Sequence, residues 1–87
     1  MNEHDLREIE ARADAAALGP WTSWIEGRDH TAGSSFIETR AAEGRGSDIE
    51  LSGASTADQD FIAAARSDVP ALIAEVRRLK QLVEAVS

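Results

Sequence analysis

The sequence predicts an α+β fold with an N-terminal helix, a three-stranded antiparallel β-meander and a C-terminal kinked helix pair. Both ends of the chain are rich in alanine and charged residues, and their apolar residues recur at the three- and four-residue steps of amphipathic helices. The middle, residues 19–55, contains all six glycines and both tryptophans between short apolar runs that are typical of strands. At 87 residues the chain has room for one domain, which we place at residues 1–87.

The first helix is expected over residues 3–18. Leu6, Ile9 and Ala13 line one of its faces, because residues three and four apart are neighbours on a helix surface. Gly19-Pro20 follows. Glycine readily adopts the left-handed conformation that ends helices, and proline cannot continue a helix, so we expect this dipeptide to end it.

The β region is expected over residues 21–52, with strands at 21–26, 35–39 and 48–52 joined by glycine-containing turns. Trp24-Ile25 and Phe36-Ile37 are pairs of large apolar neighbours, and adjacent residues of a strand point to opposite faces of a sheet. The helices can cover one face. We expect a loop, a second subunit or a ligand to cover the other.

The C-terminal part is expected to form two helices, at residues 56–66 and 69–86. Thr56 and Gln59 have the spacing of a capping box at the start of the first. Pro70 disfavours helical geometry at the residue before it, which predicts a break near residues 67–69.

Apolar residues of the last helix follow the a and d spacing of a heptad repeat. They are Val69, Leu72, Val76, Leu79, Val83 and Val86, hereafter the C-terminal seam. Two interpretations fit this spacing: packing on the protein's own sheet, or a short coiled coil with another chain. Both interpretations are correct if the helix starts on the sheet and ends on a partner. We predict a homo-oligomer whose interface comprises the C-terminal seam and Phe36.

Composition and charge argue against several functional classes. The chain has no cysteine, and its two histidines lack metal-ligand spacing, so we expect no metal, no cofactor and no enzymatic activity. A net charge of −7 disfavours binding to nucleic acids and to anionic membranes. The chain also lacks an apolar run of about 18 residues and a signal-peptide pattern, so we expect a cytoplasmic protein.

One loop concentrates groups that can bind a small polar ligand. Arg28 can bind an anion through two donors, and His30, Thr31, Ser34 and Ser35 add further hydrogen-bonding groups. Trp24 can stack on a ring, and Arg40 adds a positive charge nearby. Arg45, in the Gly44-Arg45-Gly46 turn, could bring a second positive group to the same end of the sheet, but we favour an exposed turn residue. The alternative is a solvated hairpin loop, whose usual composition is similar.

Two segments resemble a known group of proteins. Gly19-Pro20-Trp21 after a leading helix, together with DQDFIAAARSDVPALIAEVRRL at residues 58–79, is similar to small phage and prophage proteins of the Ead/Ea22-like group. The resemblance implies an accessory role in a phage or prophage setting, in the cytoplasm of a bacterial host. It implies no role for any individual residue.

Two functional hypotheses follow. The first is a non-catalytic oligomeric binder that sequesters a small polar or nucleotide-like host signal, as anti-defence proteins of phages do. The alternative is a protein–protein interaction module that binds a host or phage protein through its last helix or its apolar sheet face.

Overall fold

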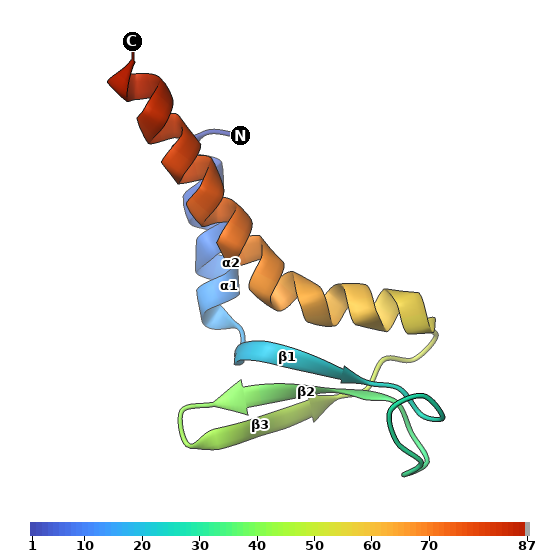
Figure 1. The fold of residues 1–87 in the computed structure, drawn as a ribbon. Helices are drawn as coiled ribbons and strands as arrows, with labels where there is room; N and C mark the ends of the chain where they lie inside the picture. Colours follow the sequence, from blue (N-terminus) through green and yellow to red (C-terminus); the bar gives the residue numbers. More distant parts are fainter. Residues whose placement is uncertain (87) are drawn as a thin grey trace.

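A computed structural model describes residues 1–86 of the chain. The elements, in chain order, are α1 (Glu3–Ala15), β1 (Leu18–Trp24), β2 (Phe36–Ala41), β3 (Gly44–Ile49) and α2 (Thr56–Ala85). The strands form one antiparallel sheet in the order β1-β2-β3, and both helices lie on the same side of it (Figure 1). This arrangement confirms the predicted α+β class with its three-stranded meander.

Helix α1 begins with a capping box and is shorter than predicted. The Asn2 side chain accepts a hydrogen bond from the Asp5 amide, and the Asp5 carboxylate accepts one from the Asn2 amide. The helix ends at Ala15, because Leu18 already pairs with Arg40 of β2. Gly19-Pro20 therefore lies inside β1 instead of ending the helix. Since β1 is an edge strand, proline is tolerated there.

Strand β3 also lies earlier than predicted. Ala41 pairs with Gly44, so a two-residue turn joins β2 to β3, and β3 ends at Ile49 rather than at residue 52. Arg45, expected in an exposed turn, is a residue of β3, and so is Gly46, because β3 already begins at Gly44. A Cβ atom at Gly46 would lie 2.5 Å from Thr39 Oγ1 and 2.8 Å from the Arg40 carbonyl oxygen, so the close strand approach requires glycine.

The C-terminal part is one bent helix instead of the predicted pair. Ser55, not Thr56, is the N-cap, and its capping-box partner is Asp58. Pro70 lies inside the helix, and Figure 1 shows α2 bending in the middle of its length. Proline removes one hydrogen bond of the helix and bends it, while the turns on both sides continue.

The core is thin and has two parts. The first half of α2 packs against β1, where Ala63 and Gln59 of the helix and Ile37 of the sheet are buried. Beyond the bend, α2 leaves the sheet and runs alongside α1 (Figure 1), with Leu6 and Ile73 buried between the two helices. Within residues 1–86, no helix combines the length and apolar character needed to cross a membrane.

Candidate functional site

The predicted ligand-binding loop is tied to α2 through Arg28. Its guanidinium donates to Asp60 Oδ2 at 2.7 Å and to Asp29 Oδ2 at 2.8 Å. Hydrogen bonds from Arg28 hold the pKa values of Asp29 and Asp60 below the ordinary 3.8. One cation thus faces two carboxylates. An anionic ligand would have to displace them to reach the guanidinium.

The remaining polar groups of the loop largely satisfy one another. His30 Nδ1 accepts from the Ala32 amide at 2.9 Å, and Ser35 Oγ accepts from the Glu26 amide at 3.0 Å. The His30 ring lies 5.4 Å from that of Phe36, and within the described residues its Nε2 atom is buried without a hydrogen-bond partner. Thr31 and Ser34 are exposed. The structure therefore turns Arg28 toward α2 and His30 toward the sheet.

The sheet face away from the helices gathers aromatic and charged side chains. This open face comprises Trp24, Phe36, Glu38, Arg40, Arg45 and Asp48. Trp24 Nε1 donates to Glu38 Oε1 at 2.9 Å, and Arg45 donates to Asp48 Oδ1 at 2.8 Å. The Arg45 guanidinium carbon also lies 5.8 Å from the centre of the Phe36 ring. Of the predicted ligand-binding residues, Trp24 and Arg40 thus share this face, whereas Arg28 does not join them.

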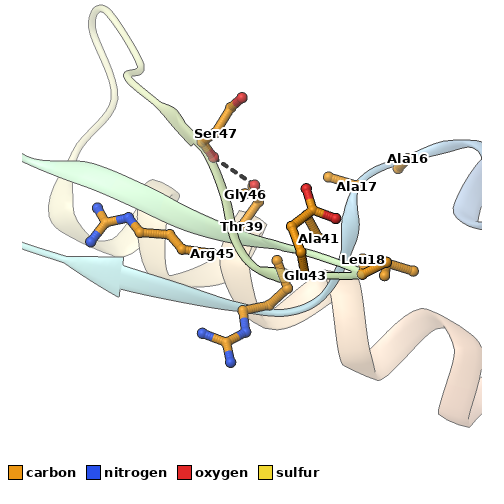
Figure 2. A pocket seen from close by; sticks show the side chains of 11 residues that line it. Ala16, Ala17, Leu18, Thr39, Ala41, Glu43, Arg45, Gly46 and Ser47 are labelled. Carbon is orange, nitrogen blue, oxygen red and sulfur yellow. Dashed lines mark hydrogen bonds between the residues drawn. The ribbon is translucent and has the colours of Figure 1, made fainter.

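An open hollow of about 630 Å³ lies at one end of the sheet. Figure 2 shows it between the start of β1 and the β2–β3 hairpin, with Ala17, Leu18 and Ala41 among its lining residues. The Thr39 hydroxyl donates to the Ser47 carbonyl at 2.5 Å, drawn as the dashed line. The Glu43 carboxylate and the Arg45 guanidinium point in different directions (Figure 2), so the hollow lacks converging polar groups.

The C-terminal seam lies mostly at the surface. Val69 and Val76 are half-buried, whereas Leu72 is 62% exposed and Leu79 47% exposed. Val83, Val86 and the neighbouring Leu82 are exposed as well. The bend carries this half of α2 away from the sheet and alongside α1 (Figure 1), and Ile73 is buried on the side that faces Leu6 and Ile9 of α1. The helix therefore starts on the sheet, but the seam itself does not pack there. Phe36, predicted in the same interface, lies on the open face of the sheet instead.

A narrow apolar groove of about 200 Å³ continues the seam toward α1. Met1, Leu6 and Ile9 form one wall, and the other wall is formed by the seam residues Val69, Leu72 and Val76 with Ile73. Met1 is exposed at this groove. The exposed apolar residues Leu79, Leu82, Val83 and Val86 follow this groove along α2.

No arrangement of metal ligands is found in the part of the chain that the structure describes. Within residues 1–86, no three histidine, aspartate or glutamate side chains come together as they would around a metal ion.

No family model matches the chain, and neither the curated proteins nor the solved structures contain a significant match. The similarity to the Ead/Ea22-like group therefore stays a prediction.

Several residues of these surfaces were not predicted from the sequence. Glu38 and Asp48 belong to the open face, and the alternation of Phe36, Glu38 and Arg40 along one strand was a usable signal for it. Asp60 holds Arg28 from a position 32 residues away, and no local pattern predicts that pair. Met1 lines the apolar groove because α1 runs beside the second half of α2, which is a tertiary effect.

Proposed function

We propose that this protein is a non-catalytic interaction module that binds another polypeptide through the C-terminal seam. The observation that carries the proposal is the exposure of Leu72, Leu79 and Leu82, which are 62%, 47% and 51% exposed along one stretch of α2. Single exposed leucines are common, but a contiguous apolar patch with a polar rim marks an interaction surface on a monomer.

The surroundings of the seam support this function. Glu75, Arg78 and Lys80 flank it and supply a charged rim, which is the usual anatomy of a protein interface. The groove beside Met1 is lined by apolar side chains of two helices, and an amphipathic helix is a partner element that packs its apolar face into such a groove. The Arg28 loop offers less, because its guanidinium already bonds to two carboxylates.

A pair of matched leucine substitutions tests the proposal. Leu79→Asp places a charge in the seam, and Leu18→Asp places the same charge on a leucine that is 51% exposed on β1, away from the seam. We expect Leu79→Asp to abolish association, measured as solution mass by light scattering and as proteins retained from a lysate of the source cells. Leu18→Asp should behave as the wild type. Equal association by wild type and Leu79→Asp would contradict the proposal.

A second candidate function is the binding of a small polar or nucleotide-like ligand on the open face. The observation that favours it is that Trp24 and Phe36 share this face with Arg40 and Arg45, which pair directly across β2 and β3. Arg40 lies 3.8 Å from Glu38 and Arg45 lies 2.8 Å from Asp48, so a bound anion would compete with these two carboxylates for the arginines. A rise in melting temperature with a nucleotide, lost in Arg40→Gln, would support this function; no rise with any nucleotide would contradict it. The phage and anti-defence setting is part of this second proposal.

A further inference from the structure

We propose that the partner of the C-terminal seam is a second copy of this chain, and that the two α2 helices pair in parallel as a short two-stranded coiled coil. This inference rests on the proposed function of the seam. It adds the identity of the partner, the direction of pairing and the residues that fix the register.

The side chains at the core positions of the seam indicate a parallel pair. With Val69 as position a, the a positions hold Val69, Val76 and Val83, and the d positions hold Leu72, Leu79 and Val86. A β-branched residue at a with leucine at d favours two-stranded parallel coiled coils over trimers and tetramers. Five of the six residues follow that rule.

The charged residues at the g and e positions, which flank the a and d positions, also indicate a parallel pair. In this heptad, Glu75 occupies a g position and Lys80 the e position of the next heptad. Parallel pairing brings g of one helix beside the following e of its partner, so Glu75 of each copy would face Lys80 of the other. Antiparallel pairing would instead set Glu75 near Leu82 and Lys80 near Ile73, without opposite charges. Within residues 1–86, Lys80 makes no ion pair, whereas the Glu75 carboxylate already accepts hydrogen bonds from Arg78 of its own helix and would be shared between Arg78 and the partner's Lys80.

The position of α1 leaves this pairing open. α1 covers the e-side residue Ile73, and Arg77 at position b bonds to Glu10 and Glu3 of α1 at 2.8 Å each. α1 also lies beside the a positions Val69 and Val76, which are half-buried, whereas the d positions Leu72 and Leu79 and the g position Leu82 stay exposed. Two α2 helices would therefore pair through the exposed residues Leu72, Leu79, Val83 and Val86, with each α1 beside the start of the seam and the groove beside Met1 next to the partner helix.

Cysteine crosslinking tests the direction, because the chain has no cysteine of its own. Leu72→Cys and Val83→Cys variants that differ in mass through a tag are mixed, unfolded, refolded together and oxidised. Parallel pairing predicts disulfides between identical chains, because each seam residue meets its own copy. Disulfides between the two different variants would show antiparallel pairing and overturn the inference, while the proposed function of the seam would stand.

Charge reversal at the flanking positions tests the register, because these substitutions lie at the protein surface. Glu75→Lys and Lys80→Glu should each weaken the dimer, by roughly fivefold in dissociation constant, and the double variant should recover most of the loss. Glu84→Lys, at the outward b position, changes the net charge by the same amount as Glu75→Lys and should have little effect. Failure of the double variant to recover affinity would overturn the register. A wild-type monomer at every concentration would overturn the choice of a second copy, and retention of another protein through Leu79 would then still support the proposed function.

Discussion

Gln59 shows how much one side chain contributes to this thin core. It is 4% exposed, and its amide nitrogen donates to Ser23 Oγ at 3.0 Å and to the carbonyls of Trp24 and Phe36 at 3.2 Å and 3.1 Å. Gln59→Leu removes these donors and leaves buried acceptors without partners, so the free energy of unfolding should fall by about 1–3 kcal/mol. Urea denaturation measures the change. Gln81→Leu, on an exposed part of the same helix, is the control, and equal effects of the two substitutions would contradict this role.

Asp60 makes the contact between the Arg28 loop and α2 dependent on pH. Arg28 lowers the pKa of Asp60 below 3.8, so the folded state binds this proton less tightly than the unfolded state. The resulting stabilisation is present above pH 3.8 and is lost as the pH falls through the lowered pKa. Asp60→Asn should therefore be less stable than the wild type at neutral pH, and the difference should shrink in acid.

Thermal unfolding across this pH range measures the effect of Asp60. Asp68→Asn removes one carboxylate from an exposed position of the same helix and controls for the change in net charge. A difference between wild type and Asp60→Asn that stays constant with pH would show that the Arg28 contact is not the cause.

At the scale of the elements, Arg66 joins α2 to the end of α1. Its guanidinium donates to the Ala13 carbonyl in the last turn of α1, where a cation is favoured; this carbonyl also accepts from the Ala16 amide at 3.3 Å. Arg66→Met should lower the free energy of unfolding by about 1.5–3 kcal/mol, because a charged hydrogen bond is lost. It should also speed amide hydrogen exchange in α1. Arg78→Met, which loses an exposed pair with Glu75 on its own helix, should cost less than about 1 kcal/mol.

The elements also show what local sequence can and cannot predict. Periodicity predicted the helices and the strand order, because both depend on local spacing and turn residues. The end of α1 was misplaced because Leu18 pairs with Arg40, a contact 22 positions away that no local signal reveals. The break at Pro70 became a bend because a long helix loses only one hydrogen bond there.

The candidate surfaces, like the elements, could be predicted from local sequence only in part. The heptad spacing predicted which residues share the C-terminal seam, since that is a property of one helix. Its exposure follows from the direction of the bend, which carries the seam away from the sheet, and a single helix does not encode this. The Arg28 loop was predicted from its composition, but Asp60 comes from another element and occupies the guanidinium.

At the scale of the whole molecule, the shape follows from a core too small to hold all of the apolar residues. The described chain measures 56 × 28 × 18 Å, with the second half of α2 extending beyond the sheet. An elongated domain of this size buries a modest part of its surface, so association through the seam would add stability that the monomer lacks. Stability should then depend on protein concentration.

The dependence of stability on protein concentration gives a prediction that can be tested without crosslinking. A partner that binds only the folded state raises the melting temperature as concentration increases. The wild-type midpoint should therefore rise over a hundredfold range of protein concentration, as measured by circular dichroism. The midpoint of Leu79→Asp should stay constant, since its seam carries a charge, whereas Leu18→Asp should keep the wild-type slope. A wild-type midpoint that does not move with concentration would mean that the seam adds no stability through self-association.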